Sequence, residues 1–274
     1  MNFGLIIIGD EILSGKREDK HLPKVIGLLA ARGLSLGWAR YVGDDPERIT
    51  ADLTDAFAAA RVKGDVVFSC GGIGATPDDH TRQSAARALG VPLALHPQAR
   101  DLIYERMRDT AAEQGQPYEP ERSDNQHRLN MGVFPQGAEI IPNPYNKIAG
   151  FSLRFDMGGG VYFVPGFPVM AWPMIEWVLD QHCAHLHRSQ LQREQSVIVF
   201  GAMEATLTPL MEGIEAQFAG IKVFSLPSVD HPQWGRHIEL GVKGQDTELI
   251  AAAYQHLLAG LREHGAQTGP ELVR

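Results

Sequence analysis

Cysteine is nearly absent from this chain of 274 residues, which contains only Cys70 and Cys183 and no Cys-x-x-Cys pair. Two isolated thiols exclude a disulfide framework and a zinc site built from thiolates, and they indicate a reducing, cytoplasmic setting. Long apolar runs are missing as well. The N-terminal run, 3–8, has no basic region before it and acidic residues directly after it. It is too short for a signal peptide or a membrane span, so we expect no membrane partner.

An excess of positive charge is also absent. The 33 Asp and Glu residues outnumber the 25 Lys and Arg residues, which gives a formal net charge of −8, and neither the part before Arg188 nor the part after it is basic. A DNA- or RNA-binding domain needs many cations to neutralise phosphates, so we expect no nucleic-acid partner. What is present, 44% hydrophobic residues and 29 glycines, is typical of a globular α/β protein.

Short apolar runs alternate with amphipathic patterns over the first 70 residues. The runs at 3–8, 34–42 and 65–70 are typical of buried strands, and the apolar spacing predicts helices over 21–31 and around 49–57. This β-α-β-α-β order predicts an α/β fold with a doubly wound, mostly parallel sheet. The loops after its first and third strands then lie at the carboxyl edge, where open α/β sheets bind ligands.

Two domains are expected, a larger one over 1–188 and a smaller α+β domain over 189–274. The larger one is completed by a helix that begins near Asp78, a helix over 97–112, an exposed loop over 114–123, strands at 139–141, 151–156 and 161–164, and a helix over about 169–187. The smaller one has a βαββα pattern, with a strand ending at Phe200, a helix over 204–218, strands at 221–226 and 237–242, and a helix over 247–263. Its tail, 264–274, is expected to be frayed.

The strongest site signal is the segment that follows the third predicted strand. Glycines between a strand and a helix let backbone N–H groups approach a phosphate, and the helix start adds partial positive charge. The predicted phosphate-binding residues are Gly71, Gly72, Gly74, Thr76 and Thr81. The segment matches neither a Walker A loop nor the G-x-G-x-x-G pattern.

Two carboxylates, Asp78 and Asp79, stand in this same segment. Beside a phosphate they would repel the anion unless a divalent cation lay between them, which predicts bridging by Mg²⁺ or a similar ion and gives both residues a catalytic role. The alternative is that Asp78 caps the helix and the glycines form a tight turn.

Two further kinds of loop are expected at the sheet edge. Gly9, Asp10 and Glu11 follow the first strand, so that Gly9 can approach the ligand and the two acids can join the metal site; alternatively the acids cap the next helix. In the loops 142–147 and 165–168, we expect Asn143 and Gly166 to contact the ligand. Asn146 and Lys147 could bind polar groups or phosphate, or simply form a turn with Lys147 in solvent.

Together these segments resemble a known family. Gly9-Asp10-Glu11-Ile12-Leu13-Ser14-Gly15, the run from Gly71 to Thr81, Pro142-Asn143 and Pro165-Gly166-Phe167-Pro168 look like the MoaB/Mog molybdopterin-binding domain family, in particular its competence/damage-inducible protein A (CinA-like) branch. The resemblance covers residues 3 to about 180. It implies a doubly wound α/β domain that binds a pterin or nucleotide phosphate, and a CinA-like protein without the C-terminal amidase domain.

One departure from the family bears on function. Its adenylyltransferases usually carry Arg-Asp before the Thr, where this chain has Asp78-Asp79-His80-Thr81. The acidic pair resembles the CinA branch, which is associated with metal-dependent hydrolysis of ADP-ribose or FAD. The first hypothesis is therefore a metal-dependent nucleotide pyrophosphatase. The second is molybdopterin binding or adenylylation in molybdenum cofactor biosynthesis.

A third, non-catalytic hypothesis is an oligomeric scaffold whose C-terminal domain binds a protein. The apolar side chains over 170–178 suit a subunit interface, so a homo-oligomer is expected. His182, Cys183, His185 and His187 crowd one helix end and could bind a metal, although His residues near a helix C-terminus are favourable in themselves.

Overall fold

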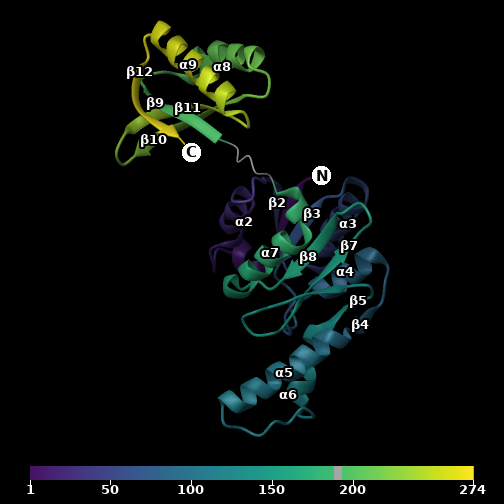
Figure 1. Cartoon of the computed structure of the whole chain (residues 1–274). Coiled ribbons are helices and arrows are strands. Elements are labelled where there is room, and N and C mark those ends of the chain that lie inside the picture. The colour runs from purple at the N-terminus through teal and green to yellow at the C-terminus, as the bar shows by residue number, and fades with distance from the viewer. Residues whose placement is uncertain (188–192, 274) are drawn as a thin grey trace. The chain divides into compact units, whose positions relative to one another are not determined.

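The computed structural model describes residues 1–187 and 193–273, and the chain divides into two compact units, Met1–His187 and Arg188–Arg274. In the part described, no helix is both long enough and apolar enough to cross a bilayer. Figure 1 shows the elements of each unit.

A six-stranded sheet forms the centre of the first unit, in the order β2-β1-β3-β8-β7-β6. β1, β2, β3 and β8 are parallel, whereas β7 runs antiparallel to both of its neighbours. The strands are β1 (Phe3–Ile8), β2 (Leu36–Val42), β3 (Val66–Cys70), β6 (Glu139–Ile141), β7 (Gly150–Arg154) and β8 (Gly160–Val164). The predicted doubly wound, mostly parallel sheet is confirmed.

Helices cover both faces of this sheet because the strand side chains alternate in direction. Leu5 and Ile7 pack beneath α2 (His21–Ala30) and α7 (Pro168–His182). Ile6 and Ile8 pack on the opposite face, with α3 (Pro46–Lys63) and α4 (Thr81–Leu89). The carboxyl ends of β1, β3 and β8 are thereby left as the open edge. Asp45 caps α3 through a 2.7 Å hydrogen bond from the Arg48 N–H.

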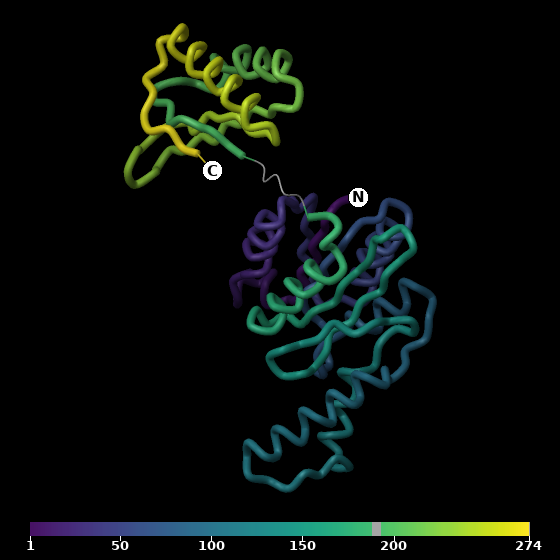
Figure 2. The backbone as a smooth tube through the Cα atoms, in the orientation of Figure 1, coloured from purple at the N-terminus to yellow at the C-terminus, as the bar shows by residue number. Residues whose placement is uncertain are grey.

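An arm of two helices projects from the first unit, as Figures 1 and 2 show. It consists of α5 (Pro97–Glu113), α6 (Ser123–Arg128) and the short 3-10 helix η1 (Leu129–Gly132), and the hairpin of β4 (Leu93–Leu95) and β5 (Val133–Pro135) forms its base. The sequence indicated α5 and the loop after it, but neither α6 nor this hairpin.

Several predicted boundaries need correction. The helix expected near Asp78 begins at Thr81, with His80 as a cap residue that makes no side-chain capping bond. The acids after β1 lie in the first turn of a short helix, α1 (Asp10–Leu13). The helix expected to reach His187 ends at His182 and is followed by a short 3-10 turn, η2 (Ala184–Leu186).

The second unit is a four-stranded antiparallel sheet in the order β10-β11-β9-β12. Its elements are β9 (Arg193–Phe200), α8 (Glu204–Gln217), β10 (Lys222–His231), β11 (Gly235–Gly244), α9 (Thr247–Glu263) and β12 (Gln267–Val273). This βαββαβ order is that of a ferredoxin-like split βαβ fold. The prediction of a frayed tail was wrong, because β12 pairs with β9 and completes the sheet. The Gly and Pro residues of β12 are uncommon within strands, so its sequence did not predict one.

Candidate functional site

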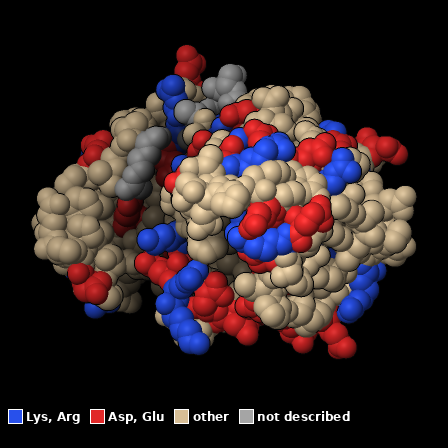
Figure 3. All heavy atoms as spheres, turned by 90° about the horizontal axis from the view of Figure 1, so that it is seen from below, with Lys and Arg blue, Asp and Glu red and all other residues tan. Residues whose placement is uncertain are grey.

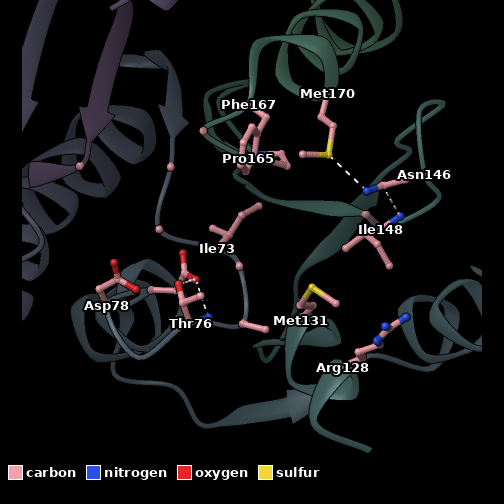
Figure 4. A pocket seen from close by; sticks show the side chains of 18 of the residues that line it. Ile73, Thr76, Asp78, Arg128, Met131, Asn146, Ile148, Pro165, Phe167 and Met170 are labelled. Carbon is pink, nitrogen blue, oxygen red and sulfur yellow. Dashed lines mark hydrogen bonds between the residues drawn. The ribbon is translucent and has the colours of Figure 1, made fainter. Parts of the chain in front are cut away.

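A pocket of about 630 Å³ lies at the open edge of the first unit's sheet. The loops after β1, β3 and β8 form one side of it, and α5, α6 and η1 of the arm form the other (Figure 4). This volume is in the range that holds a small molecule or a cofactor. Of the predicted site residues, the following line it: Gly9, Glu11, Gly71, Gly72, Gly74, Thr76, Asp78, Asp79 and Gly166.

The glycine loop after β3 has a backbone shape that requires glycine. Gly71 and Gly72 have φ angles of 108° and 67°, which L-residues with side chains rarely adopt. A Cβ on Gly71 would overlap the carbonyl oxygen of Ile8, and one on Gly72 would overlap the hydroxyl of Thr81. Thr81 in turn donates from its backbone N–H to the Gly72 carbonyl at 3.0 Å and from its hydroxyl to the Gly71 carbonyl at 3.1 Å. The helix start therefore holds the loop in place.

This geometry predicts that Gly72→Ala costs about 3 kcal/mol of unfolding free energy, from the left-handed backbone together with the overlap with Thr81. Gly90→Ala is the matched control, because Gly90 has a φ of 68° and nothing within 4 Å of its added Cβ. The control should lose only about 1 kcal/mol. Urea unfolding of both variants measures the difference, and equal losses would show that Thr81 moves aside freely.

Carboxylates converge at the end of the pocket formed by the β1 and β3 loops. Glu11, Asp44 and Asp78 all line it, and Asp44 was not predicted as a site residue. Asp10 and Asp44 hold each other through two hydrogen bonds, in which the backbone N–H of each donates to the carboxylate of the other at 2.9 and 3.1 Å. Burial raises the pKa of Asp44, and the charges of Asp10, Glu11 and Asp78 raise it further, against the opposing hydrogen bond from Asp10.

Asp78 and Asp79 have different surroundings. Asp79 accepts hydrogen bonds from the backbone N–H and the hydroxyl of Thr76, at 2.8 and 2.5 Å, and closes the end of the glycine loop. Asp78 is exposed, and hydrogen bonding within the loop keeps the pKa of its carboxyl below the usual range. Asp79 thus shapes the loop, whereas Asp78 offers a carboxylate to solvent and ligand. Neither residue caps α4.

Three predicted ligand contacts lie outside the pocket lining. Asp10 is engaged with Asp44, and Thr81 is fully buried under the glycine loop. Asn143 is buried and organises its own loop, because its side-chain amide donates to Asn146 and to the carbonyl of Ile148. These residues position others that line the pocket.

The ammonium group of Lys147 is paired within the protein and does not lie free in solvent. Its ammonium group pairs with Glu105 at 2.5 Å and with Asp109 at 2.7 Å, both on α5. Its φ of 65° is the only positive one among the non-glycine residues described. Lys147 therefore ties the loop that carries Asn146 and Ile148 to the arm.

The arm supplies the part of the pocket that the sequence did not reveal. Ile103, Arg106 and Met107 come from α5, Arg128 from α6 and Met131 from η1. No motif joins these residues to the glycine loop, so only the folded chain brings them together. Arg82 was not predicted as a site residue either. It is 5% exposed, and its guanidinium donates to the Gly74 carbonyl at 2.6 Å from beneath the loop. Burial lowers the pKa of Arg82.

Within residues 1–187 and 193–273, no three His, Cys, Asp or Glu side chains are arranged to hold a metal ion by themselves. This applies to the histidines near the end of α7 and to the carboxylates of the pocket. A cation in the pocket would need further ligands from water or from the bound molecule. Figure 3 shows the acidic and basic side chains interspersed on the face that it presents, without one continuous basic patch.

Fold and pocket together define a class of protein, a doubly wound α/β domain with a small-molecule pocket at the carboxyl edge of its sheet. The chain belongs to the probable molybdopterin binding domain family, whose model matches residues 4–185, and it is similar to CinA-like proteins.

Two curated proteins and one solved structure show what the chain is similar to. A CinA-like protein of Geotalea uraniireducens (strain Rf4) is 28% identical over 92% of this chain and 56% of its own length. One of Syntrophotalea carbinolica is 30% identical over 80% of this chain and 51% of its own length. The chain thus spans little more than half of these relatives. The crystal structure of CinA from Thermoplasma acidophilum, described as of unknown function, has 24% identity and a TM-score of 0.53 over 65% of this chain and 96% of its own, and this likeness shows the fold.

Proposed function

We propose that this protein hydrolyses nucleotide pyrophosphates such as ADP-ribose or FAD with the help of a divalent cation. The observation that carries the proposal is the convergence of Glu11, Asp44 and Asp78 on the same pocket as the glycine loop. The loop suits a diphosphate, while the carboxylates repel one another and the anion. A divalent cation between them resolves both repulsions.

That no three such side chains in residues 1–187 and 193–273 form a cage is compatible with Mg²⁺. This ion retains several waters and is commonly held by one or two carboxylates together with substrate phosphates. Asp78 and Asp44 are the candidates to hold it, with Glu11 beside them, because all three line the pocket. Asp10 lies outside the lining, and Asp79 accepts hydrogen bonds from Thr76 that close the glycine loop. Bound there, the ion would neutralise charge on the diphosphate and lower the pKa of a bound water.

Turnover measurements test this proposal. Purified protein is incubated with ADP-ribose and with FAD, with Mg²⁺ or Mn²⁺ and with a chelator, and the mononucleotide products are quantified. We expect hydrolysis that needs the added ion and stops with the chelator. The same rate in the chelator would refute the metal requirement, and no turnover with any ion would refute the activity.

A second function, molybdopterin binding or adenylylation in molybdenum cofactor biosynthesis, is favoured by the family match over residues 4–185. A pterin would use the same pocket, with its phosphate at the glycine loop. Calorimetry with molybdopterin separates the two proposals. Tight binding together with no pyrophosphate hydrolysis would favour this second function.

At the cluster of Glu11, Asp44 and Asp78, removing one charge is expected to raise stability without metal and to weaken metal binding. The folded state raises the pKa of Asp44, so its stabilising effect is greatest below the ordinary carboxylate pKa and declines as the pH rises through the raised value. Asp44→Asn removes this cost at neutral pH and keeps an oxygen that can accept from the Asp10 N–H. Without metal, the melting temperature should rise by about 1 °C, since solvent screens most of the repulsion.

With added Mg²⁺, wild type should have a higher melting temperature than Asp44→Asn. At 100 times its dissociation constant, an ion bound only by the folded state stabilises wild type by about 2.7 kcal/mol, and the variant should gain much less. Asp156→Asn, in the exposed turn at the opposite edge of the sheet, is the control. Equal stabilisation of Asp44→Asn and wild type by Mg²⁺ would remove Asp44 from the metal site.

A further inference from the structure

A buried arginine lies beneath the glycine loop without an ion-pair partner. Arg82 of α4 is 5% exposed, and its guanidinium donates to the Gly74 carbonyl at 2.6 Å. Among the residues that the structure describes, its Nε finds no acceptor and no carboxylate forms an ion pair with it. A guanidinium stays protonated in proteins, although burial lowers the pKa of Arg82. Such a charge costs free energy in the empty protein, and an anion bound on the other side of the loop would offset that cost.

The hydrogen bond from Arg82 to Gly74 fixes the direction of the next amide. A trans peptide holds its C=O and N–H on opposite sides, and the described chain contains no cis peptide bond. Because the Gly74 carbonyl is turned toward the buried guanidinium, the Ala75 N–H points the other way, toward the pocket that Ala75 lines. Figure 4 shows Ile73 and Thr76, which flank this peptide, at the same pocket.

The Ala75 N–H is available as a donor. Two other amides of the loop are used within the protein: Gly71 donates to the Val164 carbonyl at 3.0 Å, and Thr76 donates to the Asp79 carboxylate at 2.8 Å. In the part of the chain that the structure describes, no acceptor takes the Ala75 N–H, and the residue is exposed. A backbone N–H that points outward above a buried cation suits a phosphate oxygen.

Asp79 gives the buried charge a second effect. Its carboxylate lies so close to Gly74 that a Cβ there would be 2.6 Å from Oδ2, and the hydrogen bonds from Thr76 hold it in that place. A carboxylate in this position repels a diphosphate on the loop. The charges of Arg82 and Asp79 act on each other, so Arg82 offsets the repulsion from outside the pocket lining.

We propose that Arg82 is a positioning residue for the diphosphate: it turns the Ala75 N–H toward the ligand and offsets the charge of Asp79. The inference rests on the proposed function, because it takes the diphosphate of a nucleotide as the group on the loop. Arg82 touches neither the ligand nor the cation. It acts through the peptide between Gly74 and Ala75.

Calorimetry with methylenediphosphonate tests this assignment. This pyrophosphate analogue cannot be hydrolysed at its bridge, so binding is measured apart from turnover. With Mg²⁺ present, Arg82→Met should bind it about tenfold more weakly than wild type, because the charge is lost and the peptide is released. Arg82→Lys keeps the charge and should recover part of the affinity. Arg87→Met removes an exposed charge from the last turn of the same helix, and this control should bind as wild type does.

A second readout separates positioning from general damage to the fold. In wild type labelled with ¹⁵N-alanine, the Ala75 amide proton should shift downfield when the analogue binds, and in Arg82→Met this shift should be smaller. Without ligand, the urea midpoint of Arg82→Met should stay close to that of wild type, because removal of the unpaired buried charge offsets the lost hydrogen bond.

Unchanged affinity of Arg82→Met, equal weakening by Arg87→Met, or an Ala75 amide that does not shift in wild type would each overturn the inference. Failure of wild type to bind the analogue would do the same, since no diphosphate would then lie on the loop. If Arg82→Met hydrolysed ADP-ribose and FAD with wild-type kcat and KM, the proposed function would stand without this inference. Binding that depends on Arg82 in a protein that hydrolyses nothing would refute the proposed function and leave the inference standing.

Discussion

Asp78→Asn is expected to lower Mg²⁺-dependent hydrolysis of ADP-ribose and FAD at least about 100-fold, a loss typical of removing one group that stabilises transition-state charge. Asp78 is exposed in the pocket lining, and hydrogen bonding within the loop keeps the pKa of its carboxyl low, so the carboxylate is ionised throughout the neutral range. Asparagine keeps the size and removes the charge that would attract a cation. The measurement is kcat and KM over a series of Mg²⁺ concentrations.

Variants of Asp79 and Asp156 are the comparisons for Asp78→Asn. Asp79→Asn retains an oxygen that can accept from the Thr76 N–H, so it should disturb the loop less than Asp79→Ala does. Asp156→Asn, on the opposite edge of the sheet, serves as the control for a lost carboxylate. If Asp78→Asn hydrolysed both substrates at the wild-type rate, the cation would have to be held elsewhere and the proposed mechanism would fail.

The parts of the fold that the sequence made predictable are those in which local pattern and tertiary environment agree. The apolar runs of β1 and β3 are continuous because both of their faces are covered by helices. β12 was missed because its sequence, QTGPELV, contains two residues that rarely occur within strands. Pairing with β9 outweighs that local preference.

The site residues likewise fall into those that a sequence motif predicts and those that it does not. Gly71, Gly72 and Asp78 are neighbours in sequence, so one motif indicated them together with their chemistry. Asp44 and Arg128 belong to no motif. Both are distant in sequence from the glycine loop, and only the folded chain brings them to the same pocket. Asn143 and Lys147 have the residue types of a binding loop, yet their polar atoms are taken up by hydrogen bonds and ion pairs within the protein. Residue type alone cannot show that a donor already has a partner.

The stability of the pocket's far wall depends on a stack of aromatic rings. Phe151 of β7 lies between Phe134 of β5 and Phe163 of β8, with ring centroids 4.7 and 4.3 Å apart, and none of its surface is exposed. Because Phe134 belongs to the hairpin at the base of the arm, this stack joins the arm to the central sheet. The arm in turn carries Arg128 and Met131.

Phe151→Ala is therefore expected to cost about 3–5 kcal/mol of unfolding free energy, from lost burial and the cavity left between two rings. Hydrogen exchange in α5 and α6 should accelerate by more than global destabilisation explains, since the base of the arm loses its packing partner. Phe151→Leu, which refills part of the space, should cost clearly less, and Met157→Ala, 67% exposed in the turn before β8, should cost almost nothing. Urea unfolding and exchange mass spectrometry measure the two effects. A large loss of stability with unchanged exchange in the arm would show that the arm is held to the sheet by other contacts, first of all by the ion pairs of Lys147.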